Sequence, residues 1–213
     1  IGDKSSYEAL SYTWGDVNDT CEITLNGHGF QVTKKLYCAL HHLRYADQER
    51  SLWVDAICIN QNDLFEKGQM VRQMHLIYYR ADRTVLWLGE KSNDSDLALD
   101  IVCRVGQDED SASKSAIISE LEQELLPASD GSYKTAKRWE ALGNLFGRPY
   151  WTRTWIVQEI VWSRHIAVVC GERQLPYDCF RLTSIRLWEI SQRLTSAISV
   201  STILGLRGMK SIR

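Results

Sequence analysis

The most constraining stretch of this sequence is residues 52–89, in which two short apolar runs flank one amphipathic segment. Apolar side chains recur at three-to-four spacing over residues 71–81, which predicts a helix of about four turns. The flanking runs, 52–54 and 85–88, are rich in Trp and Val without clean alternation, as in strands buried on both faces of a parallel sheet. The stretch therefore predicts a right-handed βαβ unit and an α/β fold with a mostly parallel sheet.

A βαβ unit also predicts where ligands would bind, because they gather beyond the carboxyl ends of the strands in an open α/β sheet. Asp55 ends the first apolar run and could cap the loop by accepting backbone N–H groups, or it could have a functional role and bind a ribose hydroxyl or orient another side chain. The polar residues that follow favour a turn and a helix N-cap, with Glu66 placed for a capping box. They are Asn60, Gln61, Asn62 and Asp63.

A second loop could reach the same rim of the sheet. Residues 7–12 form a strand candidate that breaks at Gly15 and leaves a polar tip at residues 13–16. If this strand runs parallel to residues 52–54, its tip lies on the same side of the sheet as Asp55. Trp14 could then offer a stacking plane beside a glycine that permits close approach, or it could fold into the core.

The other elements expected along the chain follow from turn signals and periodicity. They are a hairpin at 21–32 around Asn26-Gly27 that pairs Ile23 and Leu25 with Phe30 and Val32, a helix at 34–45 capped by Thr33, helices at 97–105, 116–126 and 134–146, an acidic Ser-rich connector at 106–114, a break at 127–132, a strand at 165–170 and a helical tail from 177. We expect one α/β domain over residues 1–175 with a helical insertion at about 90–133, and a helical extension over 176–213.

Glu159 has some of the most apolar surroundings of any acid in the chain. A carboxylate there must either pair with an arginine or lie in a poorly hydrated cleft, where it would suit general acid/base chemistry. A helix from about residue 154 would place Trp155, Glu159 and Trp162 on one stripe. The candidate partners for an ion pair are Arg148, Arg153 and Arg164.

Bulk composition excludes several classes of protein. With 213 residues, 44% of them hydrophobic, the chain can bury a core, and its net charge of −2 gives no basic field for nucleic acid. No apolar run reaches the roughly 18 residues of a membrane span. The six cysteines show no ligand-like clustering, which favours reduced thiols in a cytoplasmic protein. The eight tryptophans and nine tyrosines could fill a core, line a flat-ligand pocket or form an assembly surface.

The motifs that mark several kinds of metal site and enzyme are missing from the sequence. The histidines lack HxxxH or HExxH spacing, so we expect no metal site. GxGxxG, P-loop and GxSxG motifs are also missing, which disfavours a dehydrogenase, an NTPase and a serine hydrolase. The chain begins at Ile1, which favours a domain excised from a longer protein.

Three blocks together resemble the signature of the fungal heterokaryon-incompatibility (HET) domain. They are ALSYTWGD at 9–16, LWVDAICINQND at 52–63 with the helix and VLWLG that follow, and RPYWTRTWIVQEI at 148–160. The resemblance covers residues 7 to about 171. The chain departs from the family at 65–69, where the run is less charged and Gly68 weakens the start of the helix.

The resemblance implies a domain that triggers cell death when genetically different cells fuse, with self-association and a sensor domain in the same or a partner protein. It also implies distant kinship with TIR domains, which have a flavodoxin-like fold. Some TIR domains cleave NAD at the nicotinamide-ribose bond through a glutamate in a Trp-Cys-x-x-Glu motif. Trp155 and Glu159 have that spacing here, although Ile156 replaces the cysteine.

By this resemblance, NAD would be a substrate rather than a cofactor, with Glu159 and Asp55 catalytic. A carboxylate would stabilise the oxocarbenium-like sugar as the bond breaks. The remaining candidates would bind the substrate, with a tryptophan stacking on the nicotinamide: Tyr12, Trp14, Gly15, Asp16, Asn60, Gln61 and Trp155. The alternatives are a non-enzymatic, self-associating signalling module and a hydrolase of a different nucleotide. The enzymatic case requires the loops to meet at one rim and to leave Glu159 unneutralised there.

Overall fold

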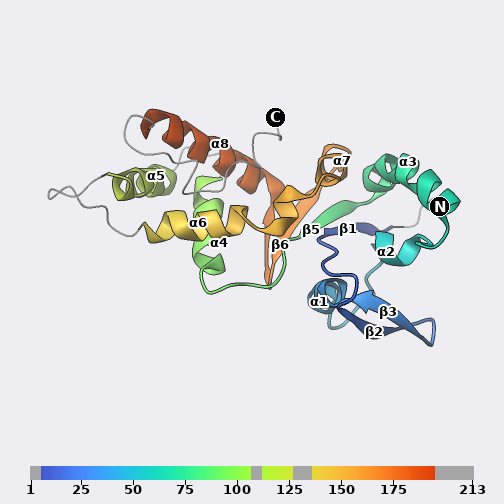
Figure 1. The fold of residues 1–213 in the computed structure, drawn as a ribbon. Helices are drawn as coiled ribbons and strands as arrows, with labels where there is room; N and C mark the ends of the chain where they lie inside the picture. The colour runs from blue at the N-terminus through green and yellow to red at the C-terminus, as the bar shows by residue number, and fades with distance from the viewer. Residues whose placement is uncertain (1–5, 107–111, 127–135, 195–213) are drawn as a thin grey trace. The chain divides into compact units, whose positions relative to one another are not determined.

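A computed structural model describes residues 6–106, 112–126 and 136–194 (Figure 1). The chain divides into two compact units. The first contains Ile1–Glu90 and Arg153–Gln174, and the second contains Lys91–Thr152 and Leu175–Arg213. The domain boundaries expected from the sequence stay a prediction. The expected break at 127–132 and most of the connector at 106–114 lie outside the described residues.

A five-stranded sheet organises the first unit, in the order β4-β1-β5-β6-β7. Strand β1 pairs in parallel with both β4 and β5, and β5 pairs in parallel with β6. Only Gly171 and Glu172 connect β6 to β7, so β7 returns antiparallel. The strands are β1 Glu8–Tyr12, β4 Leu52–Trp53, β5 Arg83–Trp87, β6 Ile166–Cys170 and β7 Arg173–Pro176.

Counted along the chain, the strands of this sheet follow the order 2-1-3-4-5 of flavodoxin-like doubly wound folds. The prediction of an α/β fold with a mostly parallel sheet is therefore confirmed. In sheets of this order the chain reverses its winding direction beside the first strand, and ligands bind beyond the carboxyl ends of the strands at that point. Here the reversal lies beside β1.

Helices α1 (Lys34–Leu43) and α3 (Leu64–Arg80) cover opposite faces of the sheet (Figure 1). Leu10 and Tyr12 belong to the core cluster formed with α1, whereas Ala9 belongs to the cluster formed with α3. Because side chains alternate along a strand, Ser11 must point to the α3 face with Ala9. A hydroxyl is thus directed into a buried layer.

The segment between β4 and α3 differs from the predicted polar loop. It contains a short helix, α2 Asp55–Cys58, because Ala56 and Ile57 pack partly against the core and Asp55 accepts a bond from the Ala56 N–H. Helix α3 then begins at Leu64 and runs through Gly68 without a break.

Asp63 is the N-cap of α3, as predicted, and accepts bonds from the backbone N–H groups of Phe65 and Glu66. The predicted capping box is wrong in its second half. The Glu66 carboxylate accepts from the Asn60 N–H, at 3.1 Å, because the tight turn after α2 brings Asn60 within its reach.

The predicted hairpin is present as β2 Thr20–Leu25 and β3 His28–Thr33. Its turn residues, Asn26 and Gly27, have positive φ values of 52° and 78°. Ile23 lies opposite Phe30 as expected, but Leu25 lies opposite His28 and Cys21 opposite Val32. Thr33 caps α1, which ends two residues before the predicted end because Arg44 is extended.

The second unit is mainly helical. Its elements are α4 Ser95–Val105, α5 Ala112–Glu124, α6 Lys137–Phe146, the 3-10 helix η1 Pro149–Thr152 and α8 Tyr177–Leu194. Trp139 is fully buried and donates its indole N–H to the Leu121 carbonyl at 2.9 Å. Within the described ranges, no helix combines the length and the hydropathy needed to cross a membrane.

The abundant aromatic side chains serve both the core and the surface. Trp53, Trp87, Trp139 and Trp151 are buried, whereas Trp155, Trp162 and Trp188 are about half exposed. Of the two cysteines in apolar runs, Cys170 is buried but Cys58 is exposed.

Candidate functional site

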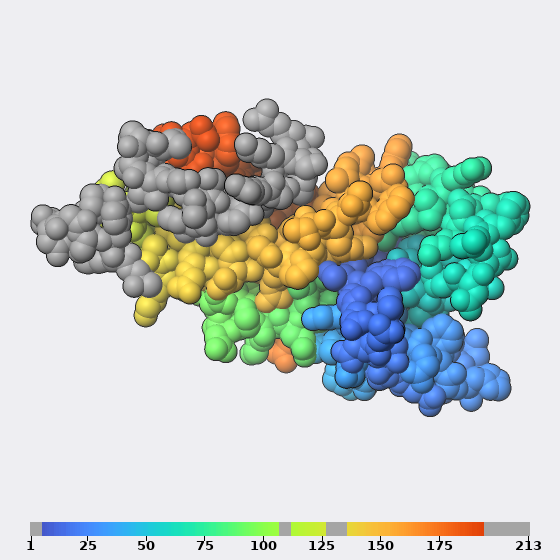
Figure 2. All heavy atoms as spheres, viewed as in Figure 1, coloured from blue at the N-terminus to red at the C-terminus, as the bar shows by residue number. Residues whose placement is uncertain are grey.

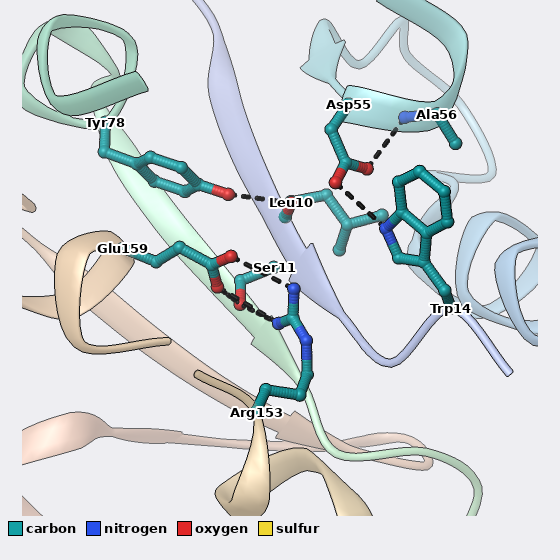
Figure 3. A network of polar contacts seen from close by, with 8 residues as sticks. All are labelled: Leu10, Ser11, Trp14, Asp55, Ala56, Tyr78, Arg153 and Glu159. Atoms are coloured by element: carbon teal, nitrogen blue, oxygen red, sulfur yellow. Dashed lines mark hydrogen bonds and ion pairs between the residues drawn. The ribbon is translucent and has the colours of Figure 1, made fainter. Parts of the chain in front are cut away.

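Loops from different parts of the first unit meet at the carboxyl rim of the sheet (Figure 3). Trp14, which follows β1, donates its indole N–H to Asp55 Oδ2 at 2.9 Å. Arg153 and Glu159 approach the same strand from α7 (Ile156–Val161) and the segment before it. The expectation that these loops lie together is confirmed.

Glu159 is an ion-paired residue. Only 1% of its surface is exposed, and Arg153 donates from Nη2 to Oε1 at 3.0 Å and from Nη1 to Oε2 at 3.1 Å. Ser11 also donates its hydroxyl to Oε2. Such a two-pronged guanidinium contact is strong and fixes orientation as well as charge. The expectation of an unneutralised Glu159 is therefore wrong, and of the three candidate arginines, Arg153 is the partner.

Arg148, another candidate partner of Glu159, donates instead to Ser95 Oγ at 2.9 Å, within the second unit. Arg153 is 15% exposed at its side chain, so it lies nearer to solvent than the carboxylate that it holds.

Ser11 was missed by the sequence analysis. A signal was present, because a polar residue between Leu10 and Tyr12 in a buried strand must find a hydrogen-bond partner. The alternation of the strand places it on the α3 face, and there its hydroxyl is fully buried between Glu159 and Arg153.

Asp55 is partly buried, accepts a backbone N–H at the start of α2 and orients the Trp14 side chain, while its contact with a ligand stays a prediction. Its Oδ1 accepts from the Ala56 N–H at 2.7 Å, and its Oδ2 holds the Trp14 indole. Burial raises the pKa of its carboxyl, and the bonds from Trp14 and Ala56 oppose this shift without cancelling it. The negative charge of Glu159 adds to the rise and Arg153 opposes it, so the two acids interact electrostatically.

Tyr12 lies beneath this cluster rather than on its surface. Its side chain is 1% exposed and belongs to the core on the α1 face. Burial raises the pKa of its hydroxyl, the charge of Asp55 raises it further, and Arg153 opposes the rise. Tyr12 is therefore neutral and contributes packing beneath Asp55 and Trp14.

Gly15 and Gln61 support the backbone around the cluster. Gly15 has a φ of +78°, and a Cβ there would meet Lys35 Cγ at 2.6 Å. Gln61 donates its amide to the carbonyls of Asp55 and Ile59, at 2.9 and 3.2 Å, and so braces α2. Both positions thereby fix the two segments that carry Trp14 and Asp55.

Three predicted site residues are exposed at the surface rather than buried in the cluster. Asp16 is exposed and accepts from the Asn18 N–H, and Asn60 is exposed and accepts from the Asn62 N–H, as turn-forming residues do. Trp155 flanks the start of α7 and is 47% exposed. The helix predicted from about residue 154 is α7, with Trp155 and Trp162 flanking its ends about half exposed, whereas Glu159 within it is buried.

The charges of the cluster can be summed from these contacts. Arg153 and Glu159 neutralise each other, which leaves Asp55 as the net charge beside an indole ring. A separate open pocket of about 340 Å³ lies at the end of α1, lined by His41, Arg44, Tyr45 and Ala46. Among the residues that the structure describes, no group of three His, Cys, Asp or Glu side chains could hold a metal ion.

Comparison with known proteins adds independent information. Residues 7–159 match the sequence profile of a family described as "Heterokaryon incompatibility protein (HET)". The chain is also 40% identical over 121 residues to "Heterokaryon incompatibility protein 6, OR allele" of Neurospora crassa, a match that covers 51% of this chain and 18% of that relative. No solved structure matches. The whole cluster, from Ser11 to Glu159, lies inside the family match.

Proposed function

This chain belongs to the heterokaryon incompatibility (HET) family, and from that membership we propose that it is an effector domain which triggers cell death when genetically different fungal cells fuse. The similarity to a named incompatibility protein supports this role. Since the match covers 18% of that relative, we place the sensor elsewhere in the same protein or in a cytoplasmic partner.

The proposed activity is cleavage of NAD at the nicotinamide-ribose bond by the rim cluster. The observation that carries it is the convergence of two carboxylates, Asp55 and Glu159, with an arginine and an indole beside β1. Sheets of this strand order bind ligands at that place.

The chemistry of the cluster suits this reaction. Breaking the nicotinamide-ribose bond develops positive charge on the sugar, which the carboxylate of Asp55 would stabilise, whereas Glu159, neutralised by Arg153, would hold that arginine in place. The donors on Glu159 and Asp55 hold both acids in place before a substrate arrives, so little reorganisation is needed for electrostatic stabilisation.

The test is to incubate concentrated protein with NAD and measure released nicotinamide. Asp55→Asn and Glu159→Gln should each lower the rate by about 100-fold or more if the carboxylates act on the transition state or hold the groups that do. Glu8→Gln is the matched control, because Glu8 is a partly buried acid paired with Arg50 and Arg83 at the opposite end of β1. Folded variants that release nicotinamide at the parent rate would remove the reaction.

A second candidate function is non-enzymatic self-association. It is favoured by the exposed apolar side chains of α7, which lies against α3 (Figure 2). The Trp162 ring lies 5.5 Å from the His75 ring of α3. Other large apolar side chains on or next to these two helices are also exposed: Trp155, Val157, Val161 and Tyr79.

The two functions separate in one comparison. Trp162→Arg should abolish self-association in sedimentation velocity if that face is the interface. In cells, loss of killing by Trp162→Arg with full killing by Asp55→Asn would favour the module, and the reverse pattern would favour the enzyme.

A further inference from the structure

The two carboxylates of the cluster are not equally available to a ligand. Both oxygens of Glu159 are engaged by Arg153, Ser11 adds a third donor, and only 1% of the residue is exposed. A ligand would have to displace the guanidinium and enter a sealed layer before it could touch this acid. Because breaking a buried ion pair is costly, Glu159 keeps Arg153 in position and does not contact the ligand.

Asp55 is in the opposite situation. It is only partly buried, and each of its oxygens accepts one bond, Oδ1 from the Ala56 N–H and Oδ2 from the Trp14 indole. An ionised carboxylate has about four lone-pair sites, so each oxygen has capacity for a further contact. The acid is fixed in orientation and still able to interact.

The charge balance points the same way. With Arg153 and Glu159 paired, the centre keeps the single negative charge of Asp55, which attracts a cation and repels an anion. Trp14 is also partly exposed, and its N–H is turned toward Asp55. A flat cation over the face of such a ring is attracted by the ring quadrupole, and the carboxylate at the edge of the ring adds its negative charge to this attraction.

We propose that Asp55 and Trp14 form the ligand-contacting pair of this centre and that they recognise a flat cationic ring. The nicotinamide ring of oxidised NAD has that chemistry, so this inference rests on the proposed function and specifies the part of the substrate that is recognised. Glu159 is a positioning residue, which holds Arg153 and neutralises it so that the charge of Asp55 prevails.

Two small probes isolate the charge of the ring. 1-Methylnicotinamide is a cation and nicotinamide is its neutral counterpart of nearly equal shape, and calorimetry can measure the binding of each. The parent should bind the cation about tenfold more tightly. Asp55→Asn should bring the ratio of the two dissociation constants close to one. Asp63→Asn is the matched control, because asparagine caps helix α3 equally well and the same unit charge is lost.

The positioning role of Glu159 has its own readout. Glu159→Gln leaves the charge of Arg153 to offset that of Asp55 and should abolish the preference for the cation. The double variant Arg153→Met/Glu159→Gln removes both charges and should restore the parent ratio, although Glu159 is still missing. Failure of the double variant to restore the ratio would show that Glu159 itself contacts the ligand and would overturn its assignment.

The outcomes for binding and for reaction are distinguishable. A preference that depends on Asp55 without nicotinamide release removes the proposed reaction and keeps the ligand-contacting pair. If the protein releases nicotinamide but does not prefer the cation, or if Asp55→Asn leaves that preference intact, the proposed reaction stands and the assignment of Asp55 and Trp14 as the ligand-contacting pair is overturned. Circular dichroism of each variant verifies that the fold is retained.

Discussion

Arg153→Met should destabilise the protein by about 3–5 kcal/mol, because it leaves the Glu159 carboxylate buried without its counter-charge. The structure sets this magnitude. Glu159 is 1% exposed and the Arg153 side chain 15%, so water can hardly replace the lost partner. Two guanidinium bonds, of 3.0 and 3.1 Å, disappear together. An effective dielectric of about 20 gives a Coulomb energy of roughly 4 kcal/mol for such a pair, which agrees with this range.

The double variant gives the decisive value. Arg153→Met/Glu159→Gln buries no charge at this position, so its stability should return to within about 1 kcal/mol of the parent or exceed it. Urea denaturation followed by circular dichroism gives the free energy of unfolding of all four proteins, and the cycle then gives a coupling free energy of about 3 kcal/mol or more.

An exposed pair in the same unit is the control. Lys34 and Asp19 lie 2.5 Å apart, but their side chains are 60% and 53% exposed, so Lys34→Met and Asp19→Asn should show far weaker coupling. A coupling for Arg153 and Glu159 no larger than that of the exposed pair would refute the reasoning, because it would mean that solvent reaches the buried carboxylate.

Three further predictions concern single positions. Gly15→Ala should cost about 1–2 kcal/mol in a urea titration, because its φ is +78° and Lys35 must also move; an unchanged midpoint would contradict this. Gly106→Ala should cost at least as much, since its Cβ would lie 2.4 Å from the backbone of Cys179, and a melting temperature equal to that of the parent would exclude the clash. Burial raises the pKa of the Asp55 carboxyl, so the folded state holds the carboxyl proton more tightly than the unfolded state does. The free energy of unfolding of the parent, relative to that of Asp55→Asn, should therefore fall as pH rises through the raised pKa. A difference between the two proteins that does not change with pH would disprove this prediction.

The periodic parts of the fold were predictable because they depend on neighbours in sequence. The spacing of apolar residues in 71–81 places a helix between two strands whatever the rest of the chain does, and Asn26-Gly27 allows the positive φ values of a hairpin turn. The end of α1 and the helix α2 were missed, because a short helix gains its stability from packing partners that lie far along the chain.

The βαβ unit and the rim where Trp14 and Asp55 meet followed from the pattern of the sequence, since parallel strands bring their carboxyl ends to one side. How Glu159 is neutralised depends on contacts that form when the whole chain folds. Its partners are Arg153, close by in sequence, and Ser11, which is 148 residues away. A buried charge pairs with whatever group the folded chain brings within about 3 Å, and this choice depends on the packing of whole elements rather than on local pattern.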